Sequence, residues 1–100
     1  LGFRSALRAF AGASNDLSEI VDKTNDLFLL DTADSGYFVT AWIGLYDADT
    51  CMLHYCSQGH PPALFLRDGK IKELSTDGLA FGVAPFLKTE VSQIKLEPDD

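Results

Sequence analysis

The hydrophobic pattern changes its period once along the chain, near residue 37, and this change restricts the possible folds more than any other feature. Before it, apolar residues recur every three or four positions, as on one face of a helix. From Phe38 onward, short runs rich in β-branched and aromatic residues are separated by turn residues, as in strands. We therefore predict an α+β fold in which two helices, within residues 1–30, precede about five antiparallel strands, within residues 37–96.

Both predicted helices have recognisable boundaries. The first covers Leu1 to Ala11, and Gly12 to Asn15 end it. Asp16 then stands at an N-cap position, and Glu19 three residues later would complete a capping box. One stripe of the second helix is apolar and contains Leu17, Ile20, Val21, Thr24, Leu27 and Phe28. We expect this stripe to pack against a sheet or against the other helix.

The first predicted hairpin joins Phe38–Tyr46 to Cys51–Ser57 through turn residues at 47–50. The run Phe38–Tyr46 has apolar residues on both faces, which indicates a central strand. The following Gly59-His60-Pro61-Pro62 must be a loop, because two consecutive prolines cannot donate hydrogen bonds to a sheet.

A second hairpin is predicted after this loop. Ala63–Arg67 and Lys70–Leu74 flank Asp68-Gly69, a pair suited to the left-handed conformations of a tight turn. A last strand is predicted over Glu90–Leu96, where apolar and polar residues alternate.

Composition excludes several classes of function. The formal net charge is −7, and no cluster of Lys or Arg offers a surface for nucleic-acid phosphates, so nucleic acid is not an expected partner. No apolar run approaches the roughly 18 residues of a membrane span, and no secretion signal is visible, so we expect a cytoplasmic protein. Cys51 and Cys56 lie an odd number of positions apart in a predicted strand, which makes a disulfide unfavourable. Neither they nor His54 and His60 show the spacing of a zinc site.

Four short segments occur in a characteristic order. They are Asn25-Asp26-Leu27, Gly36-Tyr37-Phe38-Val39-Thr40-Ala41, Gly59-His60-Pro61-Pro62-Ala63-Leu64 and Gly78-Leu79-Ala80-Phe81-Gly82-Val83. In order and spacing they resemble SpoIIE-type bacterial phosphatases, which are PPM (protein phosphatase 2C-like) serine/threonine phosphatases. The chain departs from the usual family pattern at Ser57-Gln58, where a small residue is common, and at Ala80-Phe81, where Pro-Leu is common.

The resemblance implies a sandwich of antiparallel sheets flanked by helices, incomplete at both ends, since the metal-binding aspartates of the family belong to flanking segments. It implies that two Mn²⁺ or Mg²⁺ ions activate a water molecule to hydrolyse phosphoserine or phosphothreonine. The expected partners are a phosphorylated anti-sigma-factor antagonist, an upstream sensor domain and, through the two helices, a second copy of the protein. On this account the 100 residues supply scaffold, contain no metal ligand and are inactive alone.

Within the resemblance, Gly59 and His60 are the candidate rim loop of the active site. Two interpretations of His60 stay open: its imidazole faces the phosphate as a donor or general acid, or its ring fixes the loop by bonding a backbone carbonyl. His54 lies inside a predicted strand and is expected to have a surface or core role.

Other polar residues of the four segments and their neighbours have structural interpretations. Asp77-Gly78 resembles a metal-binding Asp-Gly pair, but the residues that follow it predict a turn. Thr40 is expected to pack within a central strand, and Asn25 to bond a helix end or a loop. Asp99 and Asp100 are expected to be turn acids and not metal ligands.

Two alternatives to an active phosphatase remain at this stage. One is a catalytically silent phosphatase-like scaffold that binds a regulatory partner, which absence of the aspartate motifs from the complete protein would favour. The other is an unrelated small α+β ligand-binding domain, which a fold without two antiparallel sheets would favour.

Overall fold

The computed structural model describes residues 3–12, 14–32, 36, 38–85, 87, 89–98 and 100. Its elements are α1 (Phe3–Ala11), α2 (Leu17–Thr32), β1 (Ala41–Asp47), β2 (Met52–Gln58), β3 (Ala63–Arg67), β4 (Lys70–Leu74) and β5 (Ser92–Lys95). The named strands pair antiparallel in two sheets, which confirms the predicted α+β fold. Leu1, Tyr37 and Asp99, which the sequence analysis also interpreted, lie outside the described residues.

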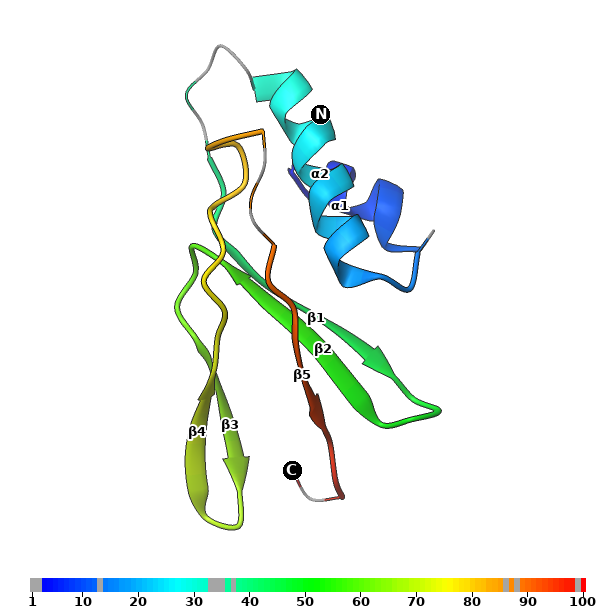
Figure 1. Cartoon of the computed structure of the whole chain (residues 1–100), viewed down its shortest axis with the longest axis vertical. Helices are drawn as coiled ribbons and strands as arrows, with labels where there is room; N and C mark the ends of the chain where they lie inside the picture. The colour runs from blue at the N-terminus through cyan, green and yellow to red at the C-terminus, as the bar shows by residue number, and fades with distance from the viewer. Residues whose placement is uncertain are drawn as a thin grey trace.

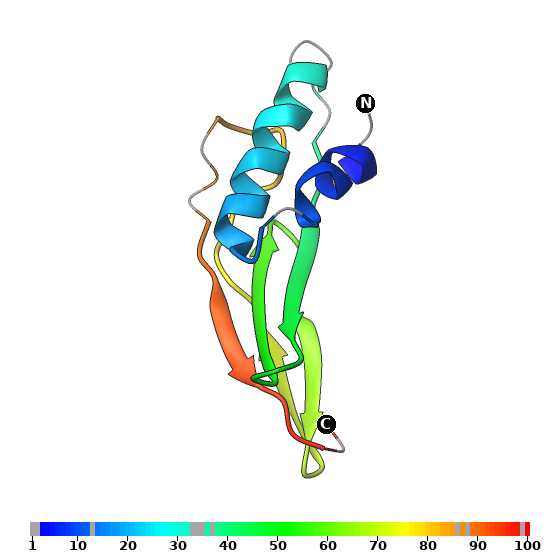
Figure 2. The same ribbon diagram turned by 90° about the vertical axis from the view of Figure 1, so that its right-hand side faces the viewer.

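The molecule is elongated, with extents of 47 × 26 × 20 Å. The two helices lie at one end, and the turns of both hairpins point toward the other (Figure 1). Figure 2 shows α1 and α2 beside each other, near the ends of β1 and β2 that are remote from their turn. Across the described residues, no helix is long and apolar enough to cross a membrane.

The start of α2 follows the sequence prediction only in part. Asp16 Oδ1 accepts hydrogen bonds from the backbone N–H of Ser18, at 3.0 Å, and of Glu19, at 3.5 Å, so the predicted N-cap is confirmed. The second hydrogen bond of the predicted capping box, from the Asp16 N–H to the Glu19 side chain, does not form, so this part of the prediction is wrong. The Asp16 N–H donates to Ser14 Oγ, and the Glu19 carboxylate pairs with Lys23 one turn later.

The three-stranded sheet has the order β1-β2-β5, so β2 is central. This corrects the prediction of a central strand over Phe38–Tyr46. The first strand begins at Ala41, because Val39 pairs with Phe81 in an isolated bridge and not with β2. β2 begins at Met52, because Cys51 adopts a left-handed φ of 60° in the turn. β5 is likewise shorter than the predicted strand.

The second hairpin has the predicted strands and turn. Leu66 pairs with Ile71 and Arg67 with Lys70, and the two turn residues Asp68 and Gly69 have φ of 52° and 72°. Positive φ at both central positions is the requirement of a type I′ turn, which glycine meets without steric cost. The Asp-Gly pair therefore determines the register of this hairpin.

The core lies between the helices and one face of the three-stranded sheet. Ala41, Ile43 and Leu45 alternate along β1 and pack against a buried cluster. The cluster contains Leu17, Val21, Phe28, Cys56, Phe81 and Leu87. The apolar stripe predicted for the second helix thus packs on the sheet, as expected.

The opposite face of the sheet contacts the second hairpin through Trp42. Its ring stacks on Tyr55 with centroids 5.7 Å apart, and its Nε1–H donates to the Leu74 carbonyl at 2.9 Å. Gly44 leaves room for this arrangement, since a Cβ there would lie 3.0 Å from the Trp42 ring. One aromatic side chain therefore connects β1 to β4 across the two sheets.

Arg67, at the end of β3, makes a second connection. Its guanidinium bonds both carboxylate oxygens of Asp100 and donates to the Lys95 carbonyl at 2.9 Å. Asp100 also accepts from the Glu97 N–H, which closes a turn after β5. The hydrogen bonds from Arg67 hold the pKa of the Asp100 carboxyl at about 2, below its usual range.

Replacing Trp42 by Phe should lower the free energy of unfolding by about 1–3 kcal/mol, because the buried Leu74 carbonyl loses its partner while the ring stacking persists. Urea denaturation followed by circular dichroism measures the effect. Phe38→Leu, at a side chain that is 61% exposed, is the matched control and should change stability by less than about 0.5 kcal/mol. Equal stability of Trp42→Phe and the parent chain would show that the bond does not connect the sheets.

The Arg67–Asp100 pair predicts a pH effect on the turn after β5. Asp100 has a folded-state pKa of about 2, below its unfolded value, so its contribution is full above pH 4 and disappears as the pH falls toward 2. NMR titration of the Asp100 side-chain carboxyl should give a midpoint near 2, and Arg67→Gln should return it to near 3.8. Lys70→Gln is the control, since within the described part of the chain the cationic partner of Asp100 is Arg67 and not Lys70. A shift of the Asp100 midpoint in Lys70→Gln as large as in Arg67→Gln would contradict the pairing.

Candidate functional site

The Gly59–His60 loop connects the end of β2 to the start of β3. Gly59 has a φ of 68°, a left-handed conformation that favours glycine, and a Cβ at this position would lie 3.2 Å from Ala80 Cβ. The two prolines that follow give the loop a restricted backbone before β3 begins at Ala63. The left-handed φ and the close contact with Ala80 together explain why glycine occupies position 59.

Hydrogen bonds on both sides hold this loop. The Gly59 N–H donates to the Gly78 carbonyl at 2.9 Å, and the Gly78 N–H donates to the Ser57 carbonyl at 3.0 Å. The Ser57 hydroxyl donates to the His60 carbonyl at 2.6 Å, while the Ser57 N–H donates to Thr76 Oγ1 at 2.7 Å. The backbone at positions 57–60 is thus fixed against the segment 76–78.

The His60 ring contacts Thr40, with 3.2 Å between its Nδ1 and Thr40 Oγ1, and both side chains are exposed. Two expectations change as a result. Thr40 does not pack within a central strand, because it precedes β1 and faces His60. The His60 ring is anchored by a side-chain hydroxyl and not by a backbone carbonyl, and its Nε2 has no hydrogen-bond partner among the described residues.

The turn predicted at Asp77-Gly78 is wrong, because Gly78 lies in an isolated bridge and Asp77 precedes it without a turn. The Gly78 backbone forms a parallel bridge with Gln58, and a Cβ at Gly78 would collide with Gln58 Oε1 and with the Ser57 carbonyl. Asp77 is exposed and lies in the segment that supports the loop. Gly78 therefore allows two backbone segments to pack closely, which is a structural role other than the predicted turn.

Sequence reasoning missed the contributions of Gln58 and Thr76. The Gln58 side chain is fully buried, and its Nε2 donates to the Leu79 carbonyl at 2.7 Å. The signal for Gln58 was its departure from the small residue usual in similar proteins. Thr76 Oγ1 had no sequence signal, since its role depends on the folded position of Ser57.

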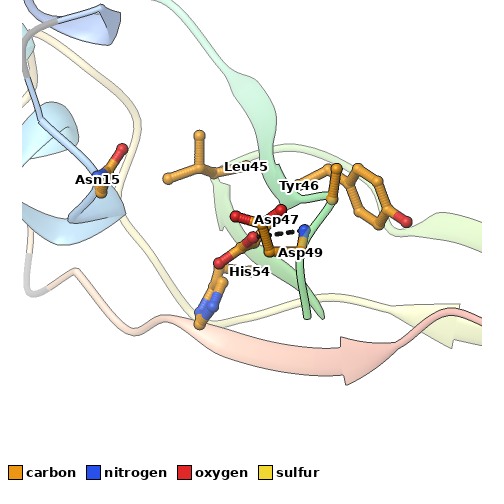
Figure 3. A pocket seen from close by; sticks show the side chains of 7 residues that line it. Asn15, Leu45, Tyr46, Asp47, Asp49 and His54 are labelled. Atoms are coloured by element: carbon orange, nitrogen blue, oxygen red, sulfur yellow. Dashed lines mark hydrogen bonds between the residues drawn. The ribbon is translucent and has the colours of Figure 1, made fainter. Parts of the chain in front are cut away.

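A second site for consideration is a hollow of about 340 Å³ beside the β1–β2 turn (Figure 3). Asp47, Asp49 and His54 come together there, while the Tyr46 ring points away. Asp47 Oδ1 accepts from the Asp49 N–H at 2.9 Å, which makes it a turn-stabilising group. A hydrogen bond between the Tyr46 hydroxyl and the Cys51 side chain raises the pKa of Tyr46 above its usual value.

The described residues supply no metal site. No group of three or more His, Cys, Asp or Glu in this part of the chain is placed to hold a metal ion. Cys51 and Cys56 are free thiols, and burial raises the pKa of Cys56 to about 11, so it is protonated at neutral pH. The described residues therefore do not form the set of ligands that two catalytic metal ions require.

The two helices and the antiparallel sheets form an α+β fold that is consistent with part of a PPM-type phosphatase domain. The family model described as "Stage II sporulation protein E (SpoIIE)" matches residues 1–100. The chain therefore belongs to the SpoIIE family of PPM-type phosphatase domains. This rejects the alternative of an unrelated ligand-binding domain.

Searches of curated proteins and of solved structures each find no match to this chain. Its assignment thus depends on the family model, which covers every residue.

Gly78→Ala should destabilise the protein by about 1–3 kcal/mol, because the added methyl group displaces Gln58 and the Ser57 carbonyl. The φ of Gly78 is not in the left-handed region, so the effect is steric. Gly12→Ala is the control, with no atom within 4 Å of its Cβ, and should change stability by less than about 0.5 kcal/mol. Chemical denaturation of both variants checks this, and equal midpoints would refute the close packing.

Proposed function

We propose that the chain is part of a metal-dependent serine/threonine protein phosphatase that dephosphorylates a regulatory phosphoprotein, such as an anti-sigma-factor antagonist in bacterial signalling. The match of the SpoIIE family model to the whole chain carries this proposal. From that match we also infer the phosphoprotein substrate, the signalling role and a cytoplasmic location. In this proposal the Gly59–His60 loop forms a rim of the phosphate site.

The exposed surface supports the view that further parts of a larger domain cover this chain. Its accessible surface is 6505 Å², whereas a self-contained protein of 10.9 kDa has about 5,600 Å². Leu64, Leu66 and Ile71 share one face of the second hairpin and are 71%, 58% and 69% exposed. An apolar face of this kind is ordinarily buried inside a domain.

The metal ions of the proposed reaction would be held by carboxylates elsewhere in the complete domain, because the described residues do not form a ligand set. When bound, Mn²⁺ or Mg²⁺ supplies an activated water and neutralises charge on the phosphate. The present chain would contribute the rigid loop that limits one side of the site.

His60 is the residue of this chain best placed to contact the phosphate. When the Thr40 hydroxyl donates to Nδ1, the other ring nitrogen, Nε2, carries the proton. Nε2 is then a hydrogen-bond donor to a phosphate oxygen. Thr40 would orient the ring, and the Ser57 hydroxyl would fix the backbone beneath it.

The two helices are the proposed surface for a sensor domain or a second copy of the protein. Phe10, Lys23, Asp26, Leu27 and Leu30 line a hollow of about 340 Å³ there. Leu30 is 82% exposed, and an apolar contact in a partner would cover it.

A catalytically silent scaffold is the second candidate function. Absence of the family's two aspartate motifs from the complete protein would favour it over the enzyme. In that case the same loop and helices would bind a phosphoprotein without hydrolysing it.

The complete protein containing this chain should hydrolyse a phosphoserine antagonist protein in the presence of Mn²⁺, and chelation should abolish the reaction. His60→Gln should lower kcat by about a hundredfold if Nε2 donates to the reacting phosphate. His54→Gln, which changes the other histidine of the chain, is the matched control and should retain the activity.

Phosphate release under single-turnover conditions gives the measurement. Binding of the antagonist without release of phosphate would reject the phosphatase and support the scaffold. If His60→Gln keeps full activity, His60 does not contact the reacting phosphate and its role is limited to anchoring the loop.

A further inference from the structure

Asn25 on α2 forms a two-sided clamp on the segment that follows Phe81. Its Oδ1 accepts from the Gly82 N–H at 3.0 Å, and its Nδ2 donates to the Ala84 carbonyl at 2.9 Å and, more weakly, to the Pro85 carbonyl at 3.5 Å. The residue is 1% exposed. The orientation of the Asn25 amide follows from its partners, because the Gly82 N–H must face Oδ1 and the Ala84 carbonyl must face Nδ2.

The clamped segment also supports the Gly59–His60 loop. Gly78 exchanges backbone hydrogen bonds with Ser57 and Gly59, and Leu79 accepts from the Gln58 side chain. Ala80 lies against Gly59. Residues 78–85 thus contact the loop at one end and α2 at the other.

A second connection runs through Phe81 and Val39. Their backbones exchange hydrogen bonds of 2.8 and 3.0 Å, and Val39 is followed directly by Thr40, which contacts the His60 ring. Phe81 is fully buried, so this bridge is held by core packing. The loop backbone and the His60 side chain therefore depend on the same short segment.

We propose that Asn25 is a positioning residue that fixes the Gly59–His60 loop from α2 through residues 78–85. The inference rests on the proposed function, in which this loop borders the phosphate. Loss of the clamp leaves the Gly82 N–H without a partner inside the protein, and the segment then opens more often. Opening at 78–85 releases the Gly59 and Gly78 amides at the base of the loop.

Amide hydrogen exchange of the complete protein tests the proposal without reference to catalysis. Asn25→Leu, which keeps the side-chain volume and removes both polar atoms, should speed exchange of the Gly59 and Gly78 amides by about tenfold, the effect of leaving one buried donor unpaired. Amides of the β3–β4 hairpin, such as Lys72, should keep their rates, because their hydrogen bonds do not involve 78–85.

Thr24→Val is the matched control. Thr24 is the neighbour of Asn25 on α2 and is fully buried, but its Oγ1 has no hydrogen-bond partner among the described residues. This variant should leave the Gly59 and Gly78 rates unchanged. If Asn25→Leu does not fold, Asn25→Ser retains a hydroxyl, leaves space for a water molecule and should show a smaller increase at the same two amides.

Two results would overturn the inference. One is unchanged exchange at Gly59 and Gly78 in a folded Asn25 variant. The other is an equal increase at those amides and in the β3–β4 hairpin, which would mark a general loss of stability. Selective opening in a protein that shows no phosphatase activity would support Asn25 as a positioning residue and reject the proposed reaction, so the two failures are distinguishable.

Discussion

Burial of Phe81 is the contact on which the rest of the structure depends. Its ring packs 4.7 Å from that of Phe3 and belongs to the cluster that contains Phe28 of α2, so it connects both helices. Its backbone pairs with Val39 ahead of β1. An apolar residue of this size, fully removed from water, contributes about 1.5–3 kcal/mol of burial free energy. Burial of Phe81 holds the segment around it against the helices, although this segment is not part of a regular strand.

The Gly59–His60 loop is held in place mostly by backbone hydrogen bonds to the segment that contains Phe81. The Gly59 N–H donates to the Gly78 carbonyl and the Gly78 N–H donates to the Ser57 carbonyl, where a Cβ at position 78 would collide with Gln58 and Ser57. The Ser57 hydroxyl also donates to the His60 carbonyl. Backbone bonds of this kind define a loop position without depending on side-chain rotamers. The His60 imidazole can therefore face outward while the chain beneath it stays fixed, which is what a loop at the rim of a binding site requires.

The sequence predicted those parts of the fold that local chemistry determines. The prediction of the second hairpin was correct at every strand boundary, because Asp68-Gly69 admits few turn geometries. The central strand was assigned wrongly, since apolar residues on both faces of β1 reflect two different partners: helices on one face and the Trp42 contact with β4 on the other. Strand order depends on β5, which lies far away in the sequence, and no local pattern encodes it.

The candidate loop was found by resemblance, but the groups that hold it were not, because they act through contacts between distant residues. Gln58 illustrates the reason. Its buried Nε2 binds the Leu79 carbonyl, while its Oε1 has no partner among the described residues and lies where a Cβ of residue 78 would be. A larger residue at position 58 thus requires glycine at position 78, and the glycine in turn permits the backbone pairing with Gly59. The buried Gln58 side chain and Gly78 therefore depend on each other for packing, and together they place the 78–85 segment where Asn25 can bond it.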